Sequence, residues 1–357
     1  MSEYLAVQRV VIVASEDSPP NPGEAYDAVE ALLEDVDGDI VYLDTNEDDA
    51  IITKDTSEIG AQVTRGSSDG TPHAILKGAA EVSFEFPLKA FLGSGEAPAY
   101  GPVLHGAGFA QEVDADDMVY TRATKNPPAF TIYEYQRSAH TDNWRLEVAT
   151  GVRGNLSFDL DNESEATASF EGRGNFHEIT DEAEFIDPAT GEIALLKDGS
   201  TAVTATSFSQ PSLDPMPCRD MIAQFDTDTY EFSAVEFDVN HESDDVNAVT
   251  GSSSRQRGAT TRGAEDRTEG SGELVGYTEA RINDVRDKAY GGDKFAWLME
   301  LENGDGKIEF QSPAAQFLPW EKTTNGNLRA YSIPFRLNGT DGLVQDDELT
   351  ITYMPPS

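Results

Sequence analysis

The sequence predicts a mainly β protein made of two antiparallel β-sandwich or barrel domains, each carrying one or two short helices. Segments in both halves alternate apolar and polar residues, as in VSFEFPL (82–88) and VEFDV (235–239), and such alternation is typical of strands buried on one face. Turn residues are dense over residues 177–215, which separates the halves. We therefore expect domains at residues 1–205 and 206–357. Because both halves alternate in the same way, an internal duplication is a working hypothesis.

The N-terminal segment predicts a strand, a helix and a second strand. VQRVVIVAS (7–15) is apolar and rich in β-branched residues, as strands are. Residues 24–35 place apolar side chains at helical spacing behind the acids Glu24 and Asp27, which favour a helix start. DIVYL (39–43) then has the composition of the next strand.

Residues 79–91 carry the clearest strand signal of the first half. The apolar side chains of one face are Ala80, Val82, Phe84, Phe86 and Leu88, and the polar side chains of the other face include Glu81, Ser83 and Glu85. A short helix over 100–107 is expected next, closed by glycines. Further strands are expected at 129–136 and 143–150 as a hairpin, and then at 151–160 and 166–176.

The second half shows the same alternation of apolar and polar residues. Residues 230–240 predict one strand with Val235, Phe237 and Val239 facing inward, so Glu236 and Asp238 face the other way. Further strands are expected at residues 294–302, 306–313, 327–339 and 347–354.

Residues 250–273 form a predicted flexible loop, because Gly, Ser and Thr dominate and no apolar period is present. The loop carries Arg255, Arg257, Arg262 and Arg267. Three interpretations stay open: a solvated loop without a role, an arm that docks on the acidic surface of a neighbouring copy, or an arm that reaches a nucleic acid.

The charge of the chain excludes several partners. Asp and Glu number 66 against 25 Lys and Arg, a formal net charge of -41, which opposes broad binding to DNA phosphates and docking on an anionic membrane. Neither a secretory signal nor an apolar stretch long enough to span a bilayer is expected. Because 38% of the residues are hydrophobic, the acids belong to a folded surface, and molar salt would screen their repulsion. The composition therefore predicts a halophilic source.

The sequence offers no catalytic or metal-binding constellation. None of the five histidines has a histidine partner three or four residues away, and no nucleotide-binding or nucleophile motif stands in its proper context. Cys218 and His105 are expected to be packing residues. The acid clusters at 35–40 and 159–164 are expected by chance in so acidic a chain. No enzymatic activity, cofactor or metal is therefore expected.

Four short segments follow one another in a recognisable order. They are Tyr100–Phe109 (YGPVLHGAGF), Gly151–Ser157 (GVRGNLS), Ala280–Arg286 (ARINDVR) and Asp346–Thr352 (DDELTIT). Over about residues 70–357 the chain resembles the tail tube (major tail) protein family of long-tailed phages and tailed archaeal viruses. In that family the third motif lies on a strand and is followed by a helix, which here is shortened to about 286–294. The first 70 residues match loosely, and the Arg-bearing insert is not a feature of the family.

The resemblance implies a structural virion protein with tail-tube-type domains. Its rings would stack into the hollow tube that conducts viral DNA during ejection, with assembly in the cytoplasm of a halophilic archaeon. Two tube domains in one chain favour three copies in a pseudo-hexameric ring, and one tube domain with an outer domain would need six. The implied partners are further copies, the tail terminator, baseplate proteins, and the tape measure protein and DNA in the lumen, with no membrane.

The resemblance also gives roles to residues. The polar side chains Glu81, Ser83, Glu85, Glu236 and Asp238 are expected to face the lumen, where acidity keeps DNA from adhering. The alternative is the solvent face of an ordinary sandwich. The four arginines of the 250–273 loop are expected to bridge stacked acidic rings.

Other functions stay open at this point. The chain could be another β-type virion protein, namely a tail terminator, a capsid protein or a decoration protein. A carbohydrate-binding module or hydrolase is a further alternative, and hydrolysis would need a cleft with paired carboxylates.

Overall fold

The structure is a computed structural model of the 357-residue chain. It describes residues 6–16, 40–45, 51–55, 58–60, 73–75, 79–89, 97–123, 129–138, 144–162, 164–179, 194–197, 201–204, 214–219, 222–225, 228–241, 267–275, 279–325, 328–340 and 347–356. The expected helix at residues 24–35 and the arginines Arg255, Arg257 and Arg262 lie outside these residues.

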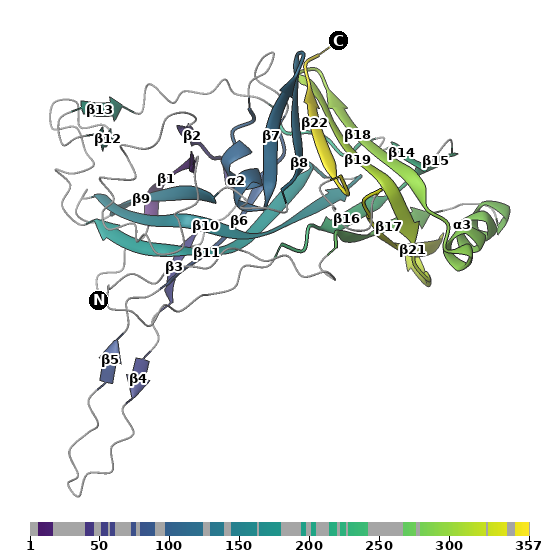
Figure 1. Ribbon diagram of the computed structural model, residues 1–357, viewed down its shortest axis with the longest axis horizontal. Helices are drawn as coiled ribbons and strands as arrows, with labels where there is room; N and C mark the ends of the chain where they lie inside the picture. Colours follow the sequence, from purple (N-terminus) through teal and green to yellow (C-terminus); the bar gives the residue numbers. More distant parts are fainter. Residues whose placement is uncertain are drawn as a thin grey trace, which may run out of the picture.

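A long antiparallel sheet organises the chain (Figure 1). Its strands lie in the order β3 (Ile52–Asp55), β6 (Ala79–Pro87), β11 (Thr167–Ile179), β10 (Trp144–Asp161), β16 (Ala234–Asp238), β17 (Glu269–Val275), β21 (Leu328–Arg336) and β20 (Glu321–Asn325). The first part of β10 pairs instead with β9 (Ala129–Ser138), which continues to β1 (Ala6–Glu16) and β2 (Ile40–Tyr42).

Strand β10 changes partner at a bulge. Its register with β11 shifts between Thr150 and Arg153, and its register with β9 shifts between Ala149 and Val152. Gly151 adopts a φ of 62°, which glycine tolerates far better than other residues. A bulge bends a strand and increases its twist. After the bend, Ser157–Asp161 pair with β16, so one long strand carries both β9 and β16 on the same edge.

A shorter antiparallel sheet packs against the long one, and its strands run steeply across it in Figure 1. The order is β15 (Asp228–Glu231), β14 (Ile222–Phe225), β18 (Phe295–Asn303), β19 (Gly306–Phe317), β22 (Thr350–Met354), β8 (Asp117–Arg122) and β7 (Phe109–Asp114). Strand β19 joins the sheets, because its last residues, Gln316 and Phe317, pair with β21. Two small ladders remain separate: β4 (Glu58–Gly60) with β5 (His73–Ile75), and β12 (Ala194–Lys197) with β13 (Thr201–Thr204).

Aromatic side chains fill the space between the two sheets. Phe310 of the short sheet lies with its ring centroid 5.2 Å from Phe158 and 5.3 Å from Phe237, both of the long sheet. Tyr100 and Tyr353 meet at 6.0 Å beside helix α2 (Gly101–Gly106). Fully burying a phenylalanine contributes roughly 2 kcal/mol, so this interface stabilises the arrangement of the sheets.

Most of the expected strands are confirmed. The structure has strands within the predicted segments at residues 7–15, 79–91, 129–136 and 166–176, and the strands expected at 143–150 and 151–160 are one continuous strand, β10. The short helix expected over 100–107 is α2. The apolar residues assigned to the inner face of β6 are at most 1% exposed. The mainly β, antiparallel class is therefore correct.

The expected single strand over 230–240 is wrong. Residues 228–231 form β15 in the short sheet, and residues 234–238 form β16 in the long sheet. Ser233 breaks the chain between them and donates its backbone N–H to the Glu273 carbonyl at 2.9 Å. Phe232 and Val235 are both buried although they lie three residues apart, so the period of two is interrupted here.

Two further expectations need correction. Residues 280–286, taken as a strand from the resemblance, lie in helix α3 (Glu279–Gly291), because Ile282, Val285 and Ala289 are spaced to pack one helical face on the core. The loop expected over 250–273 ends earlier, since β17 begins at Glu269.

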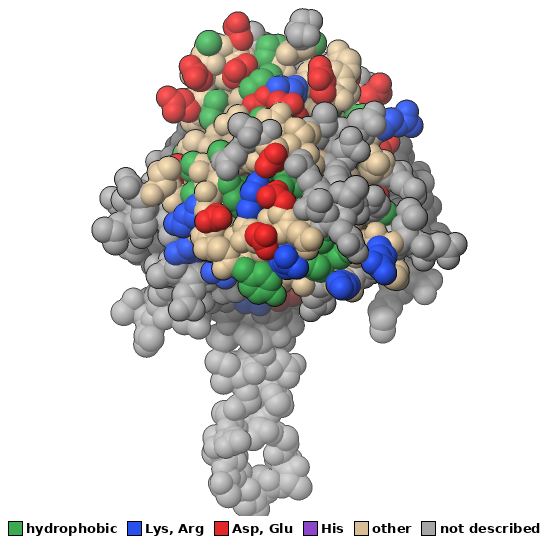
Figure 2. Space-filling view, turned by 90° about the vertical axis from the view of Figure 1, so that its right-hand side faces the viewer, with side chains coloured by type: hydrophobic (Ala, Val, Ile, Leu, Met, Phe, Trp, Pro, Cys, Tyr) green, Lys and Arg blue, Asp and Glu red, His purple; other side chains and the backbone are tan. Residues whose placement is uncertain are grey.

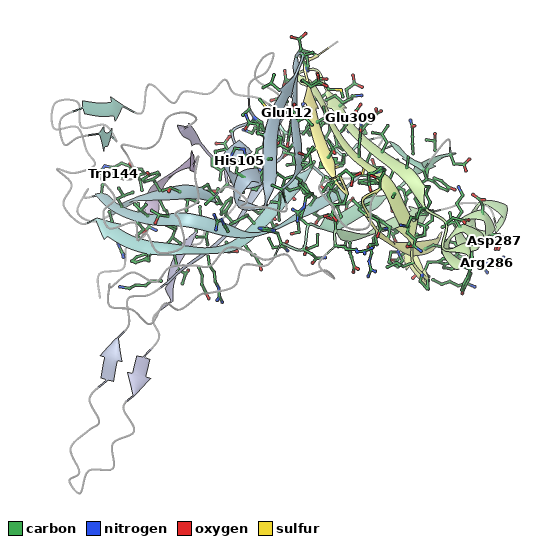
Figure 3. The ribbon with its side chains drawn as sticks, viewed as in Figure 1. His105, Glu112, Trp144, Arg286, Asp287 and Glu309 are labelled. Atoms are coloured by element: carbon green, nitrogen blue, oxygen red, sulfur yellow. The ribbon has the colours of Figure 1, made fainter. Side chains whose placement is uncertain are left out.

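Figure 3 shows Arg286 and Asp287 on α3, at the end of the molecule remote from Trp144.

The domain boundary near residue 205 stays a prediction. Pairings that cross it join β10 to β16 and β8 to β22. The buried residues on both sides of residue 205 belong to one hydrophobic cluster.

Candidate functional site

The polar side of the long sheet is the most extensive candidate functional surface. Strands β6, β11, β10, β16, β17 and β21 lie next to one another, and their inward residues are apolar. We call their outward side the acidic face. Its described acidic residues include Glu81, Glu85, Glu171, Asp159, Asp161, Glu236, Asp238, Glu269 and Glu273.

The register places polar residues from both halves of the chain in one row. Reading across the strands, the paired residues are Glu85, Ser169, Ser157, Asp238, Glu269 and Arg336. A second row contains Thr167, Asp159, Glu236 and Ser271. Because the side-chain period of a strand is two, all of these residues share one side of the sheet.

Electrostatic interaction across these rows acts on Asp159. Burial, and then the negative charges of Glu236, Asp161 and Glu85, raise the pKa of the Asp159 carboxyl above its ordinary value. Glu85 comes from the first half of the chain and Glu236 from the second. The acidic face is therefore one electrostatic unit that spans both halves.

Hydrogen bonds order part of the acidic face. The Ser271 hydroxyl donates to Glu236 at 2.9 Å, and the Asn155 amide donates to Asp238 at 2.7 Å. Two arginines compensate part of the charge, since Arg173 lies 3.3 Å from Glu81 and the Nε of Arg336 donates to Glu269 at 2.6 Å. The described acids of this face outnumber its arginines, so its net charge is negative.

A shallow depression of about 490 Å³ lies in the middle of the acidic face. It is lined by Ser157, Asp159, Ser169, Glu236, Asp238 and Ser271, together with neighbouring residues. Carboxylates at this density repel phosphate groups, and the hydroxyls among them bind water. Among the described residues, no group of three or more side chains is arranged to hold a metal ion.

The comparisons with known proteins add no assignment. No protein-family model matches the chain, and no curated protein matches it.

The structure brings together all five residues that the sequence predicted for the lumen. Glu81, Ser83 and Glu85 lie on β6, and Glu236 and Asp238 lie on β16, on the same side of the sheet. Whether this side faces a lumen stays a prediction. Sequence reasoning missed Asp159 and Glu171, although the alternation of Leu156, Phe158 and Leu160 already places Asp159 opposite the core.

Arg267 lies apart from the acidic face contacts just described. Its guanidinium donates to Asn338, and its carbonyl oxygen accepts a hydrogen bond from the Asn240 side chain at 2.7 Å. This residue is therefore held in place at the start of β17. Its predicted role in a ring-bridging loop stays a prediction.

The residues weighed for chemistry are packed in the interior or against it. Cys218 is fully buried, and burial raises the pKa of its thiol to about 12, which disfavours the reactive thiolate. His105 of α2 lies with its ring 6.0 Å from Tyr120. In the described part of the chain, no helix has the length and apolar character needed to cross a membrane.

The far end of the molecule has a different surface. Figure 2 shows basic and acidic side chains interspersed there, with acidic ones gathered at the upper end. That upper end includes the β7–β8 turn in Figure 1, where Glu112, Asp114 and Asp116 are exposed. Acidity is thus distributed over the surface and is not confined to the acidic face.

Proposed function

We propose that this protein is a tail tube protein whose copies form rings that stack into a hollow tube for viral DNA. The observation that carries the proposal is the acidic face, a continuous polar surface to which strands from both halves contribute. Three of the four motifs behind the resemblance lie on α2, β10 and at the start of β22, in the expected order. The remaining motif, Ala280–Arg286, lies on α3 and gives no support.

The acidic face would form the wall of the lumen. DNA must pass through a tube without adhering to it, and carboxylates repel phosphates. At molar salt the Debye length is about 3 Å, so the carboxylates repel DNA phosphates only when the two are nearly in contact. This short-range repulsion prevents tight binding of DNA to the wall and does not act on DNA farther away. Two arginines of the face, Arg173 and Arg336, are each paired with a carboxylate.

Ring closure would use the edges of the long sheet. A sheet with free edges tends to pair with further strands, and a closed ring of sheets removes those edges. Because both halves contribute strands to one polar face, we favour three copies in each pseudo-hexameric ring, with six copies as the alternative. The tail terminator, baseplate and tape measure proteins would be partners, and the protein would reside in the virion tail.

Electron microscopy of the purified protein in molar KCl tests the proposal. Hollow filaments of uniform diameter are the expected result. Single rings would favour a tail terminator, and closed shells would favour a capsid protein. A monodisperse monomer at all concentrations and salt conditions would contradict every assembling function.

A charge reversal separates the lumen assignment from assembly. The double variant Glu85→Lys, Glu236→Lys should still form filaments, but its filaments should retain added short DNA and protect it from nuclease. The matched control is Glu112→Lys together with Glu302→Lys, which changes the same charge at exposed residues away from the acidic face. Equal DNA retention by both variants would contradict a lumen-facing acidic face.

A further inference from the structure

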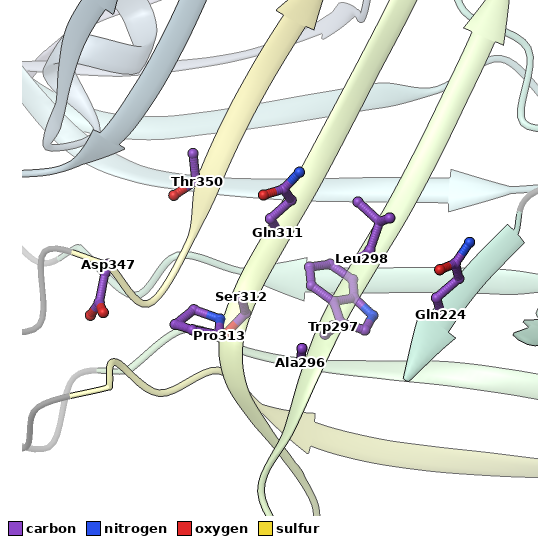
Figure 4. Close-up of a pocket in the computed structure, with 9 residues that line it drawn as sticks. All are labelled: Gln224, Ala296, Trp297, Leu298, Gln311, Ser312, Pro313, Asp347 and Thr350. Carbon is purple, nitrogen blue, oxygen red and sulfur yellow. The ribbon is translucent and has the colours of Figure 1, made fainter. Parts of the chain in front are cut away.

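A second surface, on the outer side of the short sheet, has the features of a ligand site. A groove of about 500 Å³ opens there (Figure 4). Gln224, Leu298, Gln311 and Thr350 line it from four neighbouring strands, β14, β18, β19 and β22, and they are paired residues in the ladder. The groove therefore runs across the strands.

A bulge in β19 opens the end of this groove. Phe295 pairs with Ala315 and Trp297 pairs with Ser312, so β19 has one more residue than β18 over this stretch. Pro313, which cannot donate to the ladder, lies in the bulge. Because the ladder is interrupted here, the inward residues Trp297 and Ser312 border the groove together with the outward ones.

Ser312 gives the groove an unsatisfied polar group. The residue is 2% exposed, and its hydroxyl has no hydrogen-bond partner among the described residues. A buried hydroxyl without a partner is costly. A ligand hydroxyl or a bound water in the groove would supply the missing hydrogen bond.

Among the described lining residues, neutral hydrogen-bonding groups stand beside one carboxylate, that of Asp347. Gln311 donates through Nε2 to Glu309 at 2.7 Å, which holds the amide and leaves its Oε1 as an acceptor. Asp347 accepts hydrogen bonds from the backbone N–H and the hydroxyl of Thr340. Leu298 and Pro313 add apolar surface, and none of the described residues that line the groove is a lysine or arginine.

We propose that this groove binds a short, uncharged saccharide. Amides and hydroxyls that both donate and accept match the hydroxyl groups of a sugar, and the apolar side chains match its C–H face. Pockets of roughly 300–1,000 Å³ are typical of small-ligand sites. A neutral ligand also avoids repulsion from a chain of net charge -41, and hydrogen bonds to it persist at molar salt where Coulomb forces are screened.

The chemistry of the groove supports binding without hydrolysis. Glycoside hydrolysis uses a pair of carboxylates, and Asp347 supplies the one carboxylate among the described residues that line the groove. None of its lining residues belongs to the acidic face. The saccharide proposal is therefore independent of the tube proposal, and either one can fail alone.

Calorimetric titration of the full chain in molar KCl tests the proposal. The probes are neutral mono- and disaccharides of glucose, galactose and mannose, with glucuronic acid as an anionic comparison. We expect a neutral saccharide to bind, and Gln311→Ala to weaken its binding at least tenfold. Ser312→Ala should weaken binding several-fold without lowering the melting temperature, since it removes an unsatisfied hydroxyl.

The control is Gln111→Ala on β7, an exposed glutamine of the same sheet outside the groove, which should bind as the wild type does. Absence of binding for every saccharide overturns the proposal, as does unchanged binding by both groove variants. If no saccharide binds and Gln311→Ala instead prevents filament formation, the groove is a contact between copies.

Discussion

The carboxylate of Asp159 lies on β10 between acids contributed by both halves of the chain. Burial is the largest cause of its raised pKa, followed by Glu236, Asp161 and Glu85. Between the ordinary pKa and the raised one, the folded protein holds a proton that the unfolded chain has lost. The contribution of this carboxyl to the free energy of unfolding therefore falls as the pH rises from the ordinary pKa to the raised one. Above the raised pKa the loss of stability is complete.

We expect Asp159→Asn to raise the melting temperature at neutral pH, because it removes the charge that burial and its neighbours disfavour. The gain should shrink when the pH is lowered below the raised pKa, where the wild-type carboxyl is protonated, and in molar salt. Thermal melts of both proteins at several pH values measure this. Glu112→Gln, which removes one exposed charge from β7 (Figure 3), serves as the control, and an equal gain there would contradict the argument.

At the scale of elements, a buried ion pair ties the two sheets together. The Arg122 Nε of β8 lies 3.4 Å from Glu348, and the two side chains are 2% and 0% exposed. Thr268, just before β17, donates to the same carboxylate at 2.9 Å, and Arg122 donates to the Ala107 carbonyl after α2 at 2.8 Å. One cluster thus joins segments that are up to 241 residues apart, from Ala107 to Glu348 (348 − 107).

Breaking this cluster should lower the stability of the folded protein. We expect Arg122→Gln to lower the free energy of unfolding by about 3–5 kcal/mol, because it leaves the Glu348 charge buried without its ionic partner. Denaturant titration in molar KCl measures the change. Arg286→Gln removes an arginine from the exposed pair with Asp287 and should change stability by less than about 1 kcal/mol. Equal losses of unfolding free energy in the two variants would show that the buried ion pair stabilises the protein no more than the exposed pair does.

The segment before β17 also belongs to this scale. Deletion of residues 252–265 should leave a folded protein whose filaments form poorly, if its arginines bridge stacked rings. The deletion stops short of Arg267 because that residue contacts Asn240 and Asn338. Replacing Arg255, Arg257 and Arg262 by Gln keeps the length of the segment and isolates the effect of charge. Filaments of normal length from both variants, seen by electron microscopy, would refute the bridging role.

At the scale of the whole molecule, the net charge of -41 dominates behaviour in solution. Acidic residues occupy both the acidic face and the distant β7–β8 turn, so repulsion opposes the folded state as a whole. We expect the melting temperature to rise steeply between about 0.1 M and about 2 M KCl, because the Debye length falls from roughly 10 Å to below about 3 Å. Equal melting temperatures at both concentrations would contradict a halophilic protein.

The sequence by itself determined the mainly β class and the inner and outer faces of strands that alternate clearly, whereas β7, β8, β14 and β20 were not predicted and β17 was expected to be loop. Alternation is a local property, so Phe84 and Glu85 could be assigned to opposite faces from their neighbours alone. The same local signal, read more closely, contained the break at Ser233 and the helical spacing of Ile282 and Val285. The assignment of residues 280–286 to a strand came from the resemblance and failed for that reason.

Only the tertiary structure decided which strands are neighbours. The pairing of β10 with β16 brings Glu85, Asp159 and Glu236 onto one face, and the bulge in β19 creates the groove at Ser312. Both depend on contacts between residues far apart in the chain, which local periodicity does not encode. Composition determined that the molecule is acidic, but the long-range ladder determined where that charge forms a continuous surface.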